Sequence, residues 1–305
     1  MADLRVTVAG VNFSNPLIAA SGTFGFGREY NELYSLSVLG GISSKGITLK
    51  ERLGNPSPRI AEANGCMLNA IGLQNPGVDY FIEYDLPWLK QQNITVIANI
   101  AGNTPEEYCA MAEKLSDTNV DMLEMNISCP NVKEGGVHFG TSCMGVEQIT
   151  AAVRKYCTKP LMVKLSPNVA DIGDIAASAE AGGADVISMI NTITGMRIDI
   201  QSRRPIIRNN TGGISGPALL PIAVRMIWQV YNRVKIPIVG MGGISTWKDA
   251  VELMLAGSSA LQIGTVFFTD PYAPVHIVEG LNRYLDENGI ASVTELTGTM
   301  LPWDN

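Results

Sequence analysis

The sequence has few features of a secreted, membrane-bound or nucleic-acid-binding protein. None of its 305 residues lies in an apolar run of 18 or more, so we expect no transmembrane helix. The first residues do not form a basic segment followed by an apolar one, and no secretory signal is evident. Lysine and arginine number 22 against 29 acidic residues, and the net charge of −7 argues against nucleic-acid and anionic-membrane partners.

Cysteine and histidine are also scarce. Five cysteines, an odd number, occur in this long chain without a C-x-x-C pair, and there are two histidines, His138 and His276. This pattern predicts free thiols in a reducing cytoplasm, with neither disulfides nor a metal site. We expect His276 on a helix surface and His138 in a loop. Four of the cysteines are expected to be inert: Cys66, Cys109, Cys143 and Cys157.

Glycine, in contrast, is abundant, with 31 residues. The glycines follow short apolar runs that are typical of buried parallel strands. The eight runs cover residues 17–20, 41–44, 96–100, 122–126, 161–165, 186–190, 236–239 and 260–263. Helical patterns lie between most of them, at 104–115, 145–156, 171–181, 217–233, 247–256 and 274–287. Strands that alternate with helices in this number predict an α/β fold, a closed (β/α)8 TIM barrel, in a single domain over residues 1–305.

Three segments exceed the requirements of a minimal barrel. Residues 4–13 alternate in polarity and predict an N-terminal hairpin across the barrel floor. Residues 47–75 and 193–215 form long excursions after the second and sixth strands. Both excursions leave from the C-terminal face, where barrel enzymes carry their active sites, so we expect these long loops to roof a substrate pocket.

Polar residues stand at the C-terminal ends of the predicted strands. The set is Ser21, Lys45, Asn99, Asn126, Lys164, Asn191 and Thr192. Lysine and asparagine are costly to bury without partners, so the set predicts a polar ligand at the barrel mouth. Glycines at 240–243 and 264 follow the last two strands and predict a phosphate site built from backbone amides.

A cofactor with a phosphate tail, lying across the barrel mouth, would satisfy both ends of this pocket. FMN fits, because Lys164 could stabilise negative charge on the reduced isoalloxazine ring. Pyridoxal phosphate is the alternative, since it would use Lys45 or Lys164 as a Schiff base.

The loop after the fourth strand holds Cys129 beside Pro130. A cysteine on a loop above the pocket can serve as a general base or a nucleophile. The glycine pair at 135–136 would supply the hinge of a lid, to which His138 would also belong.

Five motifs together resemble the class 1 dihydroorotate dehydrogenases. They occur in order over essentially the whole chain, at residues 20–27 (ASGTFGFG), 44–46 (SKG), 69–75 (NAIGLQN), 126–131 (NISCPN) and 240–244 (GMGGI). The resemblance implies an FMN-containing barrel that oxidises dihydroorotate to orotate in pyrimidine biosynthesis.

The resemblance also implies roles for individual residues. The implied FMN contacts are Ser21, Lys45, Gly46, Asn99, Asn126, Lys164, Ile190, Gly216, Gly242, Gly243, Gly264 and Thr265. The implied substrate contacts are Lys45, Asn69, Ala70, Ile71, Gly72, Leu73, Asn126, Asn191 and Thr192. Cys129 resembles the catalytic base, which takes a proton from C5 while a hydride leaves C6 for flavin N5. This division requires the base and the flavin on opposite faces of a clamped ring.

The electron acceptor depends on the subclass. The membrane-linked, quinone-using class carries serine at the position of Cys129 and has an N-terminal extension, so the resemblance to that class is weaker. Residues 20–30 resemble the NAD-dependent type 1B catalytic subunit, which works with a second subunit bearing FAD and a 2Fe–2S cluster, in a heterotetramer around a homodimeric core. The fumarate-using homodimer is the alternative within the family.

Two further alternatives lie outside that activity. One is a related flavin barrel that acts on another pyrimidine. The other is a non-catalytic flavin-binding platform, in which Cys129 would have no role.

Overall fold

Eight parallel strands close into a barrel in the computed structural model, which describes residues 2–128 and 139–303. The order around the barrel is β10-β15-β16-β3-β4-β7-β8-β9. The strands are β3 (Leu17–Ala19), β4 (Gly41–Ser43), β7 (Thr95–Ile100), β8 (Met122–Asn126), β9 (Leu161–Lys164), β10 (Val186–Met189), β15 (Ile238–Met241) and β16 (Ala260–Ile263). All eight predicted strands and the closed barrel are confirmed. Their residues are buried almost without exception, as expected for strands covered on both faces.

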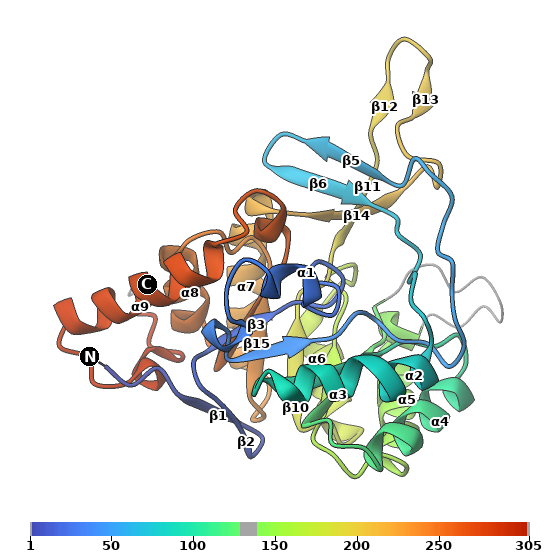
Figure 1. Cartoon of the computed structure of the whole chain (residues 1–305). Coiled ribbons are helices and arrows are strands. Elements are labelled where there is room, and N and C mark those ends of the chain that lie inside the picture. The colour runs from blue at the N-terminus through green and yellow to red at the C-terminus, as the bar shows by residue number, and fades with distance from the viewer. Residues whose placement is uncertain (1, 129–138, 304–305) are drawn as a thin grey trace.

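Helices cover the outside of the barrel (Figure 1). The six predicted ones are confirmed as α4 (Pro105–Ser116), α5 (Cys143–Arg154), α6 (Ile172–Ala181), α7 (Leu220–Tyr231) with the preceding turn η4 (Pro217–Leu219), α8 (Trp247–Leu255) and α9 (Ala273–Glu287). Thr104 caps α4, since its hydroxyl accepts from the Glu107 amide and Pro105 occupies the first helical position. Sequence reasoning missed the short helices α1 (Arg28–Asn31), η1 (Leu36–Val38), α2 (Val78–Tyr80), η2 (Phe81–Asp85) and α3 (Leu86–Gln91).

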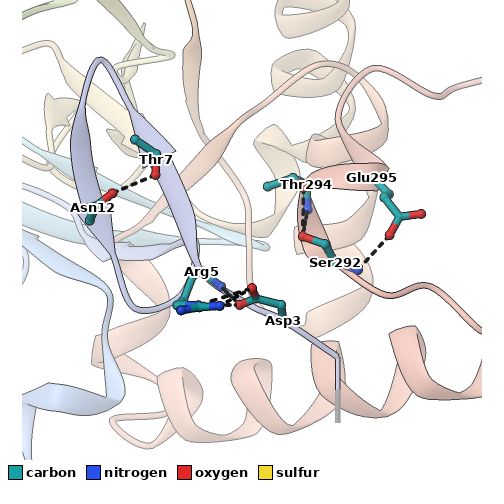
Figure 2. A network of polar contacts seen from close by, with 7 residues as sticks. All are labelled: Asp3, Arg5, Thr7, Asn12, Ser292, Thr294 and Glu295. Carbon is teal, nitrogen blue, oxygen red and sulfur yellow. Dashed lines mark hydrogen bonds and ion pairs between the residues drawn. The ribbon is translucent and has the colours of Figure 1, made fainter.

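A hairpin of β1 (Val6–Val8) and β2 (Val11–Phe13) lies at the N-terminal end of the barrel, as predicted. The Asn12 carbonyl accepts from the hydroxyl of Thr95, the first residue of β7. The chain before the hairpin pairs with the segment before η6 (Val293–Leu296), because the Asp3 amide donates to the Ala291 carbonyl and the Val293 amide to the Asp3 carbonyl. Figure 2 shows the side chains around this junction, with Arg5 bonded to Asp3 and the Ser292 amide bonded to Glu295.

The two long excursions meet in one antiparallel sheet, called the roof sheet below. It is built from β5 (Ile60–Ala63), β6 (Cys66–Asn69), β11 (Ile193–Gly195) and β14 (Gly212–Ser215), in the order β11-β14-β6-β5. A second hairpin, β12 (Ile198–Asp199) with β13 (Arg204–Pro205), extends beyond this sheet (Figure 1). Residues 47–75 and 193–215 therefore form a joint structure above the barrel, although neither was predicted to contain strands.

The main hydrophobic core runs from Leu4 to Leu296 and joins the barrel interior to the inner faces of the surrounding helices. A small second cluster of Leu68, Ala70 and Ile207 lies under the roof sheet. Among the described residues, no helix combines the length and the apolar character needed to cross a lipid bilayer.

The contact between α8 and α9 depends on a glycine. A Cβ on Gly280 would lie 2.2 Å from Cδ1 of Trp247, although alanine is otherwise the better helix residue. We expect Gly280→Ala to lower the free energy of unfolding by about 1–3 kcal/mol because of this overlap. Gly173→Ala in α6 is the matched control, since its nearest neighbours are 3.1 Å or farther away. Urea denaturation measures both variants, and equal stability of the two would contradict the packing argument.

Candidate active site

A cavity of about 530 Å³ opens at the C-terminal ends of the barrel strands. Its floor and walls come from residues that end or follow seven of the eight strands: Ser21, Lys45, Asn126, Lys164, Asn191, Gly242 and Gly264. The roof sheet contributes the opposite side, including Met67, Asn69, Gly213 and Ser215. The predicted position of the pocket and its covering by the two excursions are confirmed.

Nearly all residues predicted for the site line this one cavity. They are Ser21, Lys45, Gly46, Asn69, Ala70, Ile71, Gly72, Leu73, Asn126, Lys164, Ile190, Asn191, Thr192, Gly216, Gly242, Gly243, Gly264 and Thr265. Asn99 is not among the lining residues. It is fully buried next to Gly46, and a Cβ on that glycine would lie 3.2 Å from Asn99 Oδ1. Cys129, the glycine pair of the predicted lid and His138 lie outside the described residues.

One end of the cavity is formed by glycine backbone. Gly242 and Gly243 follow β15 with φ angles of 126° and 83°, in the left-handed region that favours glycine. A Cβ on Gly243 would lie 2.5 Å from the Leu220 amide nitrogen, at the start of α7. Gly264 immediately precedes the turn η5 (Thr265–Phe268). Exposed peptide groups beside a helix N-terminus suit a phosphate group.

Cationic side chains lie on the side of the cavity covered by the first excursion. Lys45 and Arg59 both line it, and the Arg59 guanidinium donates to the Asn55 carbonyl at 3.1 Å and to the Gln74 side chain. Burial of Lys45 lowers the pKa of its ammonium group, and the nearby positive charge of Arg59 lowers it further. This part of the cavity therefore suits an anionic group. Sequence reasoning missed Arg59, because it lies in an excursion whose course was not predicted.

The two asparagines on β8 and after β10 are held by Ser128. The Ser128 amide donates to Asn126 Oδ1 at 3.2 Å, and the Ser128 hydroxyl also donates to that oxygen. Asn191 Nδ2 donates to the Ser128 hydroxyl oxygen, and Asn191 Oδ1 accepts from the Thr192 amide. Asn126 Oδ1 is thus committed to the protein, which leaves its amide nitrogen to donate to a ligand.

Glu124 lies at the centre of the polar barrel interior and was not predicted. It is fully buried on β8, and its carboxylate accepts four hydrogen bonds of 2.6–2.8 Å. The donors are Ser43 on β4, Asn99 on β7, Ser188 on β10 and Gln262 on β16. Burial alone raises the pKa of Glu124, but the positive charge of Lys164 and the hydrogen bonds outweigh it and lower the pKa below its usual value.

Glu124 and Gln262 could have been found from the sequence. Each is a polar residue inside an apolar strand run, the same signal that identified Asn126 and Lys164. They differ from those two in standing before the last residue of the strand, which is why a search of the strand ends passed over them.

The four cysteines that the structure describes are free thiols, as predicted: Cys66, Cys109, Cys143 and Cys157. Burial raises the pKa of Cys109 and of Cys157, which keeps both thiols protonated and unreactive near neutral pH. His276 lies exposed on α9, where it pairs with Asp270, so its predicted place on a helix surface is confirmed.

Comparison with known proteins shows the family of this chain. The family model for dihydroorotate dehydrogenase matches residues 3–285. The catalytic subunit of dihydroorotate dehydrogenase B (NAD(+)) from Alkaliphilus metalliredigens is 54% identical over 298 residues, which cover 98% of this chain and 99% of that protein. Proteins of the same name from Caldicellulosiruptor saccharolyticus and Parabacteroides distasonis are 52% and 51% identical, again over 98% of this chain and 99% of each relative. The chain belongs to the dihydroorotate dehydrogenase family, whose members are flavin-dependent oxidoreductases.

Proposed function

We propose that this chain is the catalytic subunit of an FMN-dependent, NAD⁺-linked dihydroorotate dehydrogenase of pyrimidine biosynthesis. It oxidises dihydroorotate to orotate and passes the electrons on through a partner subunit. The observation that carries the proposal is the single cavity, which joins a glycine-lined phosphate end to an end rich in lysine and asparagine. The family match over residues 3–285 agrees with it.

The residues present fit FMN, and we propose one FMN-binding domain over residues 1–305. Gly242 and Gly243 line the cavity and approach Ala223 and Leu220 of α7 too closely to admit a Cβ, so the wall there is bare backbone. Lys164 brings a cation to the cavity. FMN supplies the hydride acceptor when it is bound. The proposed cofactor contacts are Ser21, Lys45, Gly46, Asn99, Asn126, Lys164, Ile190, Gly216, Gly242, Gly243, Gly264 and Thr265.

The substrate is a cyclic imide with a carboxylate group. Lys45 and Arg59 provide positive charge for that carboxylate, and Asn126 Nδ2 provides a donor. The proposed substrate contacts are Lys45, Asn69, Ala70, Ile71, Gly72, Leu73, Asn126, Asn191 and Thr192. Held in this way, the ring keeps one fixed orientation, which the removal of a proton from one face and a hydride from the other requires.

Cys129 directly follows Ser128, whose hydroxyl links Asn126 and Asn191. We propose that the Cys129 thiolate removes the proton from C5 while the hydride leaves C6. The C5–C6 double bond of orotate forms as these two bonds break, and FMN would supply the acceptor for the hydride. A positioned base contributes about 10²–10⁴-fold to such a step.

The curated relatives are named catalytic subunits, which implies a further subunit. We propose that this partner carries FAD and a 2Fe–2S cluster, that the complex is a heterotetramer around a homodimeric core, and that it works in the cytoplasm. NAD⁺ then receives the electrons at the partner and not at the cavity of this chain.

Visible absorption of the purified chain tests the proposal directly. We expect a flavin spectrum that bleaches when dihydroorotate is added without oxygen. Reoxidation by NAD⁺ only in the presence of the partner would support the type 1B assignment, and reoxidation by fumarate would support the homodimeric type. A flavin that dihydroorotate does not bleach would move the substrate to another pyrimidine or leave a non-catalytic platform.

Replacement of Cys129 tests the base. We expect Cys129→Ala to retain FMN and to lose about 10²–10⁴-fold in the rate of flavin reduction, because proton removal from C5 loses its base. Stopped-flow bleaching measures this rate. Cys66→Ala is the control, since Cys66 is a free thiol with no proposed role. A yellow Cys129→Ala protein that is reduced at the normal rate would rule out the base assignment.

The lowered pKa of Lys45 predicts a pH dependence of ligand affinity. Below its pKa the ammonium group is charged and binds the carboxylate, and a lowered pKa means that the charge is lost at a lower pH than in an exposed lysine. We expect orotate affinity to fall by about tenfold or more through this alkaline range, because a hydrogen bond to a charged group contributes about 1.5–3 kcal/mol.

Flavin absorbance changes on orotate titration measure the affinity at each pH. Lys45→Gln should bind orotate weakly at neutral pH, without the alkaline fall. Lys50→Gln is the matched control, because Lys50 is exposed and is absent from the cavity lining. An alkaline fall that persists in Lys45→Gln would assign the titration to another group.

A further inference from the structure

The polar cluster around Glu124 contains two amides whose oxygens lack partners. Asn99 Nδ2 donates to Glu124 Oε2 at 2.6 Å, and Gln262 Nε2 donates to Glu124 Oε1 at 2.8 Å. Asn99 Oδ1 and Gln262 Oε1 are both buried, and neither has a hydrogen-bond partner among the described residues. A buried acceptor that remains unsatisfied costs about 1–3 kcal/mol, so two of them in one cluster require an explanation.

The carboxylate determines which way each amide faces. An ionised carboxylate only accepts hydrogen bonds, whereas a side-chain amide has one donating and one accepting atom. Each amide must therefore turn its nitrogen toward Glu124 and its oxygen away. The lowered pKa of Glu124 agrees with an ionised carboxylate at neutral pH. The orientation of Asn99 and Gln262 is thus a chemical consequence of the charge on Glu124.

The free oxygens lie beside the proposed cofactor cavity. Gln262 itself lines the cavity, and Asn99 Oδ1 lies 3.2 Å from the place that a Cβ on the lining residue Gly46 would take. Two oriented acceptors at this place suit a ligand that donates N–H groups. The isoalloxazine ring carries an N3–H group in all of its redox states and gains N5–H on full reduction.

We propose that Glu124 is a positioning residue for the flavin: its charge holds Asn99 and Gln262 as acceptors toward the N–H groups of the ring, and offsets the positive charge of Lys164 beside the ring. The inference rests on the proposed binding of FMN. Glu124 acts through its neighbours and does not itself contact the cofactor.

A purely structural role would make a different prediction. If Glu124 only joined the strands, loss of any one of its four hydrogen bonds would lower stability and leave flavin binding unchanged. Ser188 and Gln262 separate these roles, because both donate to the same oxygen, Oε1, and Ser188 does not line the cavity.

The decisive variants are Glu124→Gln and the matched pair Gln262→Met and Ser188→Ala. In Glu124→Gln, one carboxylate oxygen is replaced by an NH₂ group, which donates hydrogen bonds and no longer accepts them. The amide that faced this oxygen, Asn99 or Gln262, must then turn its own oxygen inward and its nitrogen toward the ring. We expect FMN to dissociate at least tenfold more readily from Glu124→Gln, equivalent to about 1.4 kcal/mol. The midpoint potential of the remaining bound flavin should shift to a more positive value, because Lys164 loses its compensating charge.

Each of Gln262→Met and Ser188→Ala loses one hydrogen bond to Glu124 Oε1, but Gln262→Met also loses a hydrogen bond to the ring. Because a hydrogen bond contributes about 1 kcal/mol, we expect Gln262→Met to bind FMN at least about fivefold more weakly than Ser188→Ala. FMN fluorescence on dilution of the holoprotein measures dissociation, and dye equilibration measures the potential. Ser188→Ala should match the wild type in both quantities, even if it melts at a lower temperature.

Wild-type dissociation and potential in Glu124→Gln would overturn the proposal. If that variant does not fold, equal FMN binding by Gln262→Met and Ser188→Ala would overturn it instead. A wild-type chain that binds no FMN would show that the proposed function fails, which is a separate outcome from failure of the role of Glu124.

Discussion

The polar interior of the barrel depends on one buried charge, the carboxylate of Glu124. An isolated carboxylate in such a place would be strongly destabilising, because it loses its hydration. Four hydrogen bonds from four other strands and the positive charge of Lys164 compensate for that loss. Each strand that supplies a donor is thereby constrained in rotation and register. Three of these strands, β4, β10 and β16, also lead into residues that line the cavity, so the same bonds help to position its wall.

The covering of the cavity depends on a different constraint, the pairing of two excursions far apart in the sequence. Asn69 and Gly213 are register partners in β6 and β14, and Asn69 Nδ2 donates to the Gly213 carbonyl. A Cβ on Gly213 would lie 2.1 Å from Oγ1 of Thr192, which stands in the short connection from β10 of the barrel to β11 of the roof sheet. The barrel mouth and the roof sheet are therefore built as one unit, and the predicted substrate contacts come from both parts.

Local sequence patterns predicted the barrel well, because each strand and helix has its own apolar periodicity and its own residues that begin and end it, such as glycine and proline. The strand ends predicted most of the cavity lining for the same reason, since parallel strands bring their carboxyl ends together. The roof sheet was not predicted, because the pairing of β6 with β14 depends on tertiary contacts that no local pattern records. The helical segment at 78–91 was also missed, because it lies within the crossover that follows the first excursion.

The distribution of chemistry along the cavity follows from these constraints. The proposed phosphate end is built from glycine backbone against the start of α7, where side-chain identity contributes little. Elsewhere the site is built from side chains whose orientation depends on hydrogen bonds, with Ser128 holding two asparagines and Glu124 holding two amides. In the proposed cofactor site, anchoring of the phosphate and tuning of the ring therefore fall to different kinds of group. A substitution in the buried polar cluster can therefore alter the reactivity of the ring while the glycine backbone still holds the phosphate. A site in which the same side chains held the phosphate and oriented the ring would not allow the two properties to change separately.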